Sequence, residues 1–361
     1  MRVLTIVGAR PQFVKAAVLS AELESRGVVE TLVHTGQHYD YNMSGAFFDG
    51  LAMRKPAHTL GVGSGGHGAQ TGEMLKRLEP IAEAAAADWT IVYGDTNSTL
   101  AGALVAAKLQ VPLAHVEAGL RSFDRAMPEE INRIVADSVS DLLLAPNERA
   151  ASQLRAEGIR GRIAVVGDLM ADLAARVAET LPARPAVLDR FELTRGEYAV
   201  ATIHRASNTA DAATFERLLA GLRAVGMPVV FPVHPRTAAL ARAAEAGQRD
   251  NILLCEPLPY HEMIGLVANA RVTLTDSGGL QKETVALGVP CVTLRAETEW
   301  TETLEEGWNV LAGTDPAAIA RAAMRAIPPR RIDPYGGGRC AAHIVDALLV
   351  PAARESCASS S

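Results

Sequence analysis

Acidic side chains stand where apolar runs end in the first half of the chain. Asp95 follows the run at 89–93, Glu117 follows the run at 112–116, and Glu129 opens a helical pattern one turn before Arg133. Asp95 could instead cap the helix that follows it, and Glu129 could complement that helix's dipole. Three carboxylates gathered at one cleft are costly unless they have a function. The pattern therefore makes all three candidate catalytic groups.

The first apolar run leads into residues 8–15 (Gly-Ala-Arg-Pro-Gln-Phe-Val-Lys). Gly8 permits a tight turn, Pro11 suits the first turn of a helix, and the helix start offers backbone amides to an anion. Arg10 and Lys15 add positive charge at this end, where cations are disfavoured unless an anion is present. A pair of exposed surface cations is the alternative interpretation.

A glycine-containing turn in the second half has the features of a second anion site. Residues 275–283 (Thr-Asp-Ser-Gly-Gly-Leu-Gln-Lys-Glu) follow one apolar run and open a helix. The backbone at Ser277, Gly278 and Gly279 permits close approach, so that consecutive amides can cradle a diphosphate. Glu283 lies about one and a half turns into the helix, where it could accept hydrogen bonds from ribose hydroxyl groups. Together with Arg10, this pattern predicts a nucleotide diphosphate as ligand.

Two histidines also follow strands in the second half. His204 precedes Arg205 after one run, and His234 precedes Pro235 and Arg236 after another. A single histidine at such a place is usually structural, but two on one sheet edge favour phosphate contacts or acid–base chemistry. No histidine, cysteine or aspartate spacing fits a zinc site, and no serine–histidine–aspartate or Walker pattern occurs. We expect neither a metal nor a cofactor.

Alternating apolar runs and helical patterns must position these residues. Strands are predicted at 3–7, 31–35, 89–93, 112–116, 142–145 and 163–166, and again at 198–203, 229–233, 252–255, 272–275 and 290–294. Strand–helix alternation predicts parallel sheets covered by helices on both faces, with ligands at the carboxyl ends of the strands. The proline-containing segment at 181–185 is the best linker candidate. We expect two doubly wound Rossmann-like domains, 1–180 and 186–338, that face a central cleft.

Composition narrows the class of protein further. The 361 residues are 48% hydrophobic, and the formal net charge of -6 argues against a duplex nucleic-acid partner. Four cysteines without metal-ligand spacing, among them Cys291 in an apolar run, favour core packing and a reducing, cytoplasmic compartment. No stretch has the ~20 apolar residues of a membrane helix, and the first apolar run ends too soon for a secretory signal.

Taken in their order along the chain, the motifs resemble those of the non-hydrolysing UDP-N-acetylglucosamine 2-epimerases over nearly the whole chain. The matching segments are 8–15, 35–38 (Thr-Gly-Gln-His), 93–97 (Tyr-Gly-Asp-Thr-Asn), 115–121 (His-Val-Glu-Ala-Gly-Leu-Arg), 128–133 (Pro-Glu-Glu-Ile-Asn-Arg) and 275–283. The resemblance implies the GT-B fold, a homodimer, and a last helix, within 339–361, that joins the first domain.

The resemblance also implies a role for each candidate residue. The implied catalytic residues are Asp95, Glu117, Glu129 and His204. The implied UDP-sugar-binding residues are Arg10, Lys15, Arg133, His234, Ser277, Gly278, Gly279 and Glu283.

The implied reaction breaks the bond from C1 to UDP and removes the proton from C2. UDP then adds back to the resulting 2-acetamidoglucal while C2 is protonated from the opposite face. This chemistry needs acid–base groups on both faces and negative charge near a cationic transition state, which the carboxylates can supply.

Two departures leave alternatives open. Many bacterial members carry a Gln-His-Arg segment for a second, activating UDP-sugar, but here Gln37 and His38 are followed by Tyr39. Residues 8–13, 65–68 and 297–300 resemble a branch with archaeal members and with epimerases of modified sugars such as UDP-2,3-diacetamido-glucuronate. The remaining rivals are a GT-B glycosyltransferase, a hydrolysing epimerase that releases the free sugar, and a catalytically silent UDP-sugar-binding regulator.

Overall fold

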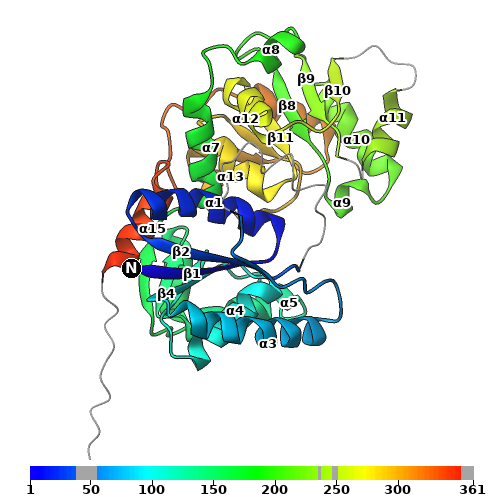
Figure 1. Cartoon of the computed structure of the whole chain (residues 1–361). Coiled ribbons are helices and arrows are strands. Elements are labelled where there is room, and N and C mark those ends of the chain that lie inside the picture. Colours follow the sequence, from blue (N-terminus) through cyan, green and yellow to red (C-terminus); the bar gives the residue numbers. More distant parts are fainter. Residues whose placement is uncertain (38–54, 235–236, 246–250, 351–361) are drawn as a thin grey trace, which may run out of the picture. The chain divides into compact units, whose positions relative to one another are not determined.

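The structure is a computed structural model that describes residues 1–37, 55–234, 237–245 and 251–350 (Figure 1). The chain forms two compact units: unit 1 comprises Met1–Asp172 and Arg339–Ser361, and unit 2 comprises Leu173–Gly338. The chain passes from one unit to the other inside helix α7 (Leu169–Thr180), before the segment at 181–185. The expected domain assignment and the central cleft stay predictions.

Unit 1 contains a seven-stranded parallel sheet with the strand order β3-β2-β1-β4-β5-β6-β7. Its strands are β1 (Arg2–Val7), β2 (Val29–His34), β3 (His58–Thr59), β4 (Trp89–Tyr93), β5 (Leu113–Val116), β6 (Leu142–Ala145) and β7 (Arg162–Val165). Its helices are α1 (Arg10–Ser25), α3 (His67–Ala85), α4 (Asn97–Lys108), α5 (Pro128–Val139), α6 (Glu148–Ala156) and α15 (Cys340–Leu349).

Helices cover both faces of the unit 1 sheet (Figure 1). Leu4, Ile6 and Val92 join an apolar cluster with α3 and α4 on one face, and Leu143 packs with α6 on the other. The last helix α15 packs against α1, and Asp346 on α15 pairs with Arg26. Strands that are buried on both faces consist mostly of apolar residues, which is why apolar runs in the sequence predict them.

Unit 2 contains a six-stranded parallel sheet with the order β10-β9-β8-β11-β12-β13. Its strands are β8 (Ala199–Thr202), β9 (Val229–Pro232), β10 (Ile252–Cys255), β11 (Val272–Thr275), β12 (Cys291–Thr293) and β13 (Asn309–Leu311). Its helices after α7 are α8 (Ala186–Arg190), α9 (Ala206–Thr209), α10 (Ala212–Arg223), α11 (Ala238–Glu245), α12 (Tyr260–Asn269), α13 (Gly278–Ala286), the 3-10 helix η1 (Thr301–Gly307) and α14 (Pro316–Met324).

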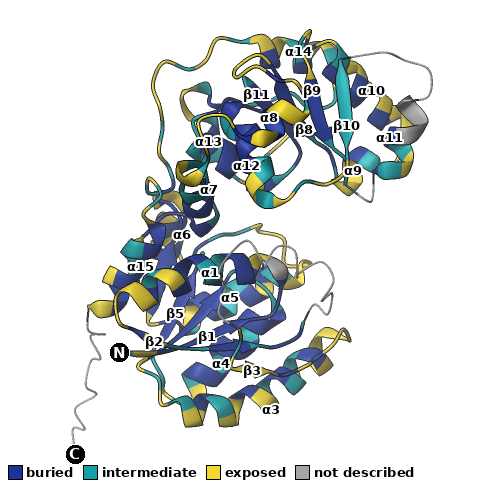
Figure 2. Ribbon diagram, turned by 45° about the horizontal axis from the view of Figure 1, so that its top comes forward, coloured by how far each residue is buried: buried dark blue, intermediate teal, exposed yellow. Residues whose placement is uncertain are grey.

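The unit 2 sheet is also covered on both faces. Phe215 from α10 and Ile319 from α14 pack with alternate strand residues on one face, while Leu188 from α8 and Leu266 from α12 pack on the other. Figure 2 shows buried strands in both sheets, with exposed residues gathered on the outer sides of helices. Two doubly wound parallel sheets confirm the expected α/β fold class.

The predicted strands at 89–93, 142–145, 252–255 and 272–275 have the observed bounds, and the other predicted strands agree to within two residues at each end. The sequence did not predict β3 or β13, which lie at sheet edges. Both residues of β3 are exposed, and β13 has only three residues. A strand as polar as β3 or as short as β13 lacks the apolar run that marks a buried strand.

Candidate functional site

In each unit, several of the predicted site residues lie where the connections of the sheet change direction. In unit 1 the neighbouring strands β1 and β4 lead to strands on opposite sides of the sheet, and β8 and β11 do the same in unit 2. Ligands of doubly wound sheets bind beyond the carboxyl ends of the strands at such a switch point. Lys15, Asp95 and Glu117 follow β1, β4 and β5, whereas His204 and Ser277 follow β8 and β11.

Glu117 lies at the carboxyl end of β5 with a cation beside it. Its carboxylate forms an ion pair with the ammonium group of Lys15 on α1, and both side chains are largely buried, with 9% and 12% exposed. Glu117 has φ +69°, a left-handed conformation that is uncommon in residues other than glycine. Such backbone strain persists only where the surrounding structure holds it, and it clusters at functional sites.

Asp95 follows β4 and pairs with Arg133 of α5, its carboxylate 2.5 Å from one guanidinium nitrogen. The other nitrogen lies 3.0 Å from Glu130, which also accepts hydrogen bonds from the amide and hydroxyl of Ser122. Burial alone would raise the pKa of Glu130, but these hydrogen bonds hold the pKa below its ordinary value. The side chain that caps α4 belongs to Thr96, so Asp95 is not an N-cap.

The turn after β1 is held by Gln12. Its carbonyl oxygen accepts hydrogen bonds from the amides of Gly8 and Ala9, and its amide donates to the Tyr93 carbonyl 2.6 Å away. The sequence predicted that the start of α1 offers amides to an anion, but Gln12 occupies these two. Gly8 is needed for close approach, since a β-carbon there would lie 1.9 Å from the Ser98 hydroxyl oxygen.

In unit 2, Asp276 holds the backbone in place at the carboxyl ends of the central strands β8 and β11. Its buried carboxylate accepts hydrogen bonds from the amides of His204 and Arg205, and His204 Nδ1 lies 3.2 Å from one of its oxygens. Burial alone would raise the pKa of Asp276, but these contacts hold the pKa below its ordinary value. The rings of His204 and His234 stack with centroids 5.6 Å apart, so two of the predicted site residues are neighbours.

The N-terminus of α13 has the geometry expected of an anion site. Ser277 is its N-cap and accepts a hydrogen bond from the Leu280 amide. A β-carbon on Gly278 would lie 2.6 Å from the indole nitrogen of Trp300, whereas one on Gly279 would meet only the Ser277 hydroxyl oxygen at 3.9 Å. Gly278 therefore makes room for Trp300, and Gly279 leaves the helix end open to a ligand.

The chain matches a sequence model of the UDP-N-acetylglucosamine 2-epimerase family over residues 21–349. The chain belongs to this family. As a member it is an isomerase, which confirms the expected enzyme class. It is 44% identical to a UDP-N-acetylglucosamine 2-epimerase homolog of Methanococcus maripaludis, with 96% of this chain and 99% of that protein covered.

Two further relatives bear on the choice of sugar. The epimerase is 44% identical to the UDP-2,3-diacetamido-2,3-dideoxy-D-glucuronate 2-epimerase of Pseudomonas aeruginosa, over 96% of this chain and 99% of that one. It also resembles the crystal structure of the Methanocaldococcus jannaschii UDP-GlcNAc 2-epimerase in complex with UDP-GlcNAc and UDP. That likeness has a TM-score of 0.79 at 38% identity and covers 96% of this chain and 99% of the other.

The structure places the remaining predicted residues of the epimerase as follows. Glu129 lies in the first turn of α5, the helix that also carries Arg133. Glu283 on α13 accepts a hydrogen bond from the Tyr260 hydroxyl 3.0 Å away. Gln37 accepts hydrogen bonds from the amide and hydroxyl of Ser98 in α4. Arg10 begins α1.

Some contacts were not predicted from the sequence, and the expected contacts with UDP stay predictions. His38 lies outside the described residues. Lys15 and Arg133, both expected to contact the UDP portion, pair with the carboxylates of Glu117 and Asp95. The sequence did not single out four buried polar residues that support the candidate residues: Gln12, His115, Asp137 and Asp276. For His115 and Asp276 the available signal was a polar side chain within or directly after an apolar strand.

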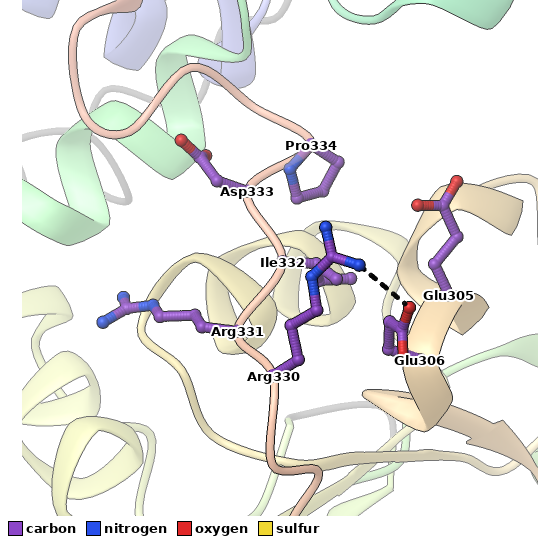
Figure 3. Close-up of a pocket in the computed structure, with 7 residues that line it drawn as sticks. All are labelled: Glu305, Glu306, Arg330, Arg331, Ile332, Asp333 and Pro334. Carbon is purple, nitrogen blue, oxygen red and sulfur yellow. Dashed lines mark ion pairs between the residues drawn. The ribbon is translucent and has the colours of Figure 1, made fainter.

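Two surface pockets of unit 2 are lined by none of the predicted site residues. One, of about 290 Å³, lies between Glu305–Glu306 and residues 330–334, where Arg330 is 3.6 Å from Glu306 (Figure 3). The other, of about 410 Å³, borders the end of α7. Carboxylates and guanidinium groups are mixed in the first, which does not suit a nucleotide diphosphate. We therefore place the candidate site at the strand ends rather than in either pocket.

Two features are absent from the described part of the chain. None of its helices combines the length and apolar character that crossing a bilayer requires. Within the same residues, no three or more histidine, cysteine, aspartate or glutamate side chains are grouped so that they could hold a metal ion.

Proposed function

We propose that this epimerase interconverts UDP-N-acetylglucosamine and UDP-N-acetylmannosamine without hydrolysing them. The observation that carries the proposal is the pair Asp95 and Glu117, which follow the hydrogen-bonded strands β4 and β5 and each pair with a cation from a helix. Carboxylates held in this way at a switch point suit acid–base chemistry on a bound nucleotide sugar.

The reaction proceeds by elimination and re-addition. The C1–O bond to UDP breaks and the bonding electrons leave with UDP, while a carboxylate takes the proton from C2 to give a 2-acetamidoglucal. UDP then adds to C1 and a proton returns to C2 on the other face, which inverts C2. The atoms balance without an oxidant or a reductant.

Unit 1 supplies the groups for proton transfer. Asp95, Glu117 and Glu129 act as acid, base and stabilisers of positive charge at C1. Lys15 and Arg133 give two of these carboxylates, the largely buried Glu117 and the partly exposed Asp95, a charge partner. Arg10, at the start of α1, is the residue of this unit that the family resemblance assigns to the UDP portion.

Unit 2 supplies the groups that hold the nucleotide. The amides of Ser277, Gly278 and Gly279 at the start of α13 bind the diphosphate, because a helix N-terminus offers donors and a favourable dipole. Glu283 accepts hydrogen bonds from the ribose. His204, with Asp276 behind it, lies at the reacting centre, and His234 stacks beside it.

A second candidate is the 2-epimerisation of UDP-2,3-diacetamido-2,3-dideoxyglucuronate. The observation in its favour is the 44% identity to the Pseudomonas aeruginosa enzyme of that name. Both candidates use the same elimination at C1 and C2 and differ only in the substituents at C3 and C6. The choice between them therefore concerns the sugar, not the reaction.

The same proposal includes a homodimer in the cytoplasm that binds a UDP-sugar and needs no metal or cofactor. Sedimentation of the purified chain tests the oligomeric state. A glycosyltransferase, a hydrolysing epimerase and a catalytically silent UDP-sugar-binding regulator are the rivals. They predict, respectively, a sugar transferred to an acceptor, release of free N-acetylmannosamine with UDP, and ligand binding without turnover.

Proton NMR in D2O tests the proposal. The chain is incubated with UDP-N-acetylglucosamine, and in parallel with the 2,3-diacetamido-glucuronate analogue, without added cofactor. Deuterium at C2 together with the C2 epimer, still linked to UDP, is the expected result, and the faster substrate identifies the sugar. Absence of exchange with both sugars would reject the proposal and favour a transferase or a binding protein.

A further inference from the structure

A fully buried histidine lies behind the candidate carboxylates. His115 on β5 has 0% exposure, its Nδ1 lies 2.7 Å from the Asp137 carboxylate, and its Nε2 lies 2.7 Å from the Gly94 carbonyl oxygen. The ring has no access to a ligand, and protein atoms occupy both of its nitrogens. His115 therefore cannot transfer a proton to the sugar, and its effect must pass through the groups that it contacts.

The two contacts fix the protonation state of the ring. Both partners are hydrogen-bond acceptors, and a neutral imidazole has only one N–H to donate. A protonated Asp137 is not an alternative, because its other oxygen lies 2.7 Å from Arg121 and 3.1 Å from the Gly119 amide, which favour the ionised carboxylate. His115 is therefore an imidazolium that donates from both nitrogens.

The charges around the ring agree with this state. Burial alone would lower the pKa of His115, but the Asp137 carboxylate, the Gly94 carbonyl and Glu117 raise the pKa above its ordinary value. Arg121, which shares Asp137 with the ring, is in turn held by both oxygens of Glu157. Two cations and two carboxylates thus balance, so that a buried charged histidine is not left uncompensated.

The other charged groups near the ring lie one contact further away. Asp95 follows Gly94 in the chain and pairs with Arg133 of α5, and Lys15 of α1 pairs with Glu117. Each of these charges is already matched by an opposite one.

The end of β5 holds Gly94 by two hydrogen bonds. The His115 ring donates to the Gly94 carbonyl, and the Val116 carbonyl accepts from the Gly94 amide at 2.9 Å. The Glu117 carboxylate lies close by, since a β-carbon on Gly94 would be 3.3 Å from one of its oxygens. Glu117 has a positive φ, a conformation that needs such support in a residue other than glycine, whereas Gly94 adopts a positive φ without strain. The peptide bond after Gly94 leads directly to Asp95.

We propose that His115 is a permanently protonated positioning residue, which locks the Gly94–Asp95 peptide against Glu117 and so sets the spacing of the two candidate carboxylates. The catalytic consequence rests on the proposed function, whereas the protonation state does not. Displacement of a catalytic carboxylate by about 1 Å can lower the reaction rate on the order of 100-fold. A residue that positions the carboxylate can therefore control the rate without contacting the sugar.

Two variants separate positioning from packing. In His115→Gln the amide nitrogen takes the place of Nε2 and still reaches the Gly94 carbonyl, whereas in His115→Asn it takes the place of Nδ1 and reaches only Asp137. We expect His115→Asn to lower kcat about 100-fold and His115→Gln by about 10-fold or less, with KM changed by less than about threefold in both. Both variants should lose similar stability. Equal losses of kcat in the two would overturn the positioning role.

Nitrogen NMR of histidine-labelled wild-type protein tests the charge itself, with the His115 signal identified from the variants. We expect both ring nitrogens to carry protons from about pH 7 to pH 8, where a free histidine is mostly neutral. A neutral His115 ring at pH 7 would overturn the inference even if the enzyme is active. The wild-type protein could show a doubly protonated His115 and yet exchange no deuterium into any nucleotide sugar. That result would reject the proposed function and the catalytic consequence, but not the protonation state of His115.

Discussion

The ammonium group of Lys15 forms an ion pair with the carboxylate of Glu117, and the two residues lie 102 positions apart in the chain. The pair joins the first helix of unit 1 to the end of β5. A cation that the sequence assigned to phosphate binding is therefore also the charge partner of a candidate catalytic group. The two assignments are compatible, because an ammonium group has three N–H donors.

Replacement of Lys15 by methionine should destabilise the fold. Glu117 would keep a largely buried charge without its partner, and we expect the free energy of unfolding to fall by about 2 kcal/mol, less than for a fully buried pair. Urea denaturation measures the change. The matched control is the double variant Lys15→Met with Glu117→Gln, which leaves no charge and should recover most of the loss; no recovery would show that the ion pair is not the cause.

Glu117→Gln should separate chemistry from binding. The amide keeps the shape of the side chain but cannot accept the C2 proton, so we expect kcat to fall by about 10²–10⁴-fold. The UDP dissociation constant, measured by calorimetry, should change by less than about threefold. Turnover like that of the wild type would remove Glu117 from the mechanism.

Asp95 and Thr96 provide a test with adjacent residues. Because Thr96 caps α4, Thr96→Ala should cost about 1 kcal/mol of stability and leave kcat within about threefold. Asp95→Asn should do the reverse, with kcat lowered about 100-fold and stability changed by less than about 1 kcal/mol. Thermal unfolding and deuterium exchange at C2 measure the two effects. A large loss of stability without loss of turnover in Asp95→Asn would return Asp95 to a structural role.

The two glycines at the start of α13 should respond differently to alanine. Gly278→Ala would place a methyl group against Trp300, so we expect it to cost about 1–3 kcal/mol and to weaken UDP binding. Gly279→Ala has open space and should stabilise the fold by about 0.5 kcal/mol, yet weaken UDP binding if the diphosphate approaches this helix end. Calorimetry measures the affinity of each variant for UDP. Unchanged affinity in Gly279→Ala would place the diphosphate elsewhere.

Asp276 should make stability depend on pH. Because its pKa in the folded protein lies below the ordinary value of 3.8, the carboxylate stabilises the fold at pH values above that, and the contribution is lost as pH falls through the lower, folded-state pKa. Asp276→Asn should therefore be less stable than wild type at pH 7, and the difference should shrink in acid. Denaturation curves over this range measure it. A difference that stays constant with pH would assign the effect to hydrogen-bond geometry rather than to charge.

The sequence by itself determined the alternation of strands and helices and the end of the sheet at which chemistry occurs. Runs such as Trp89–Tyr93 and Val272–Thr275 are buried on both faces, so the apolar pattern is local and legible. The same pattern places Asp95, Glu117 and Ser277 directly after strands or at their ends. It could not find β3 and β13, whose pairing at sheet edges depends on neighbours rather than on their own residues.

Only the tertiary structure decided which charges pair and which side chains cap. In the folded chain Lys15 forms an ion pair with Glu117, and Thr96 is the N-cap of α4. His115 lies between Asp137 and Gly94. These choices join segments distant in the chain, and they depend on strand register and helix packing. The residue type determines which hydrogen bonds a side chain can donate or accept. Its partner is determined only when the strands and helices have packed.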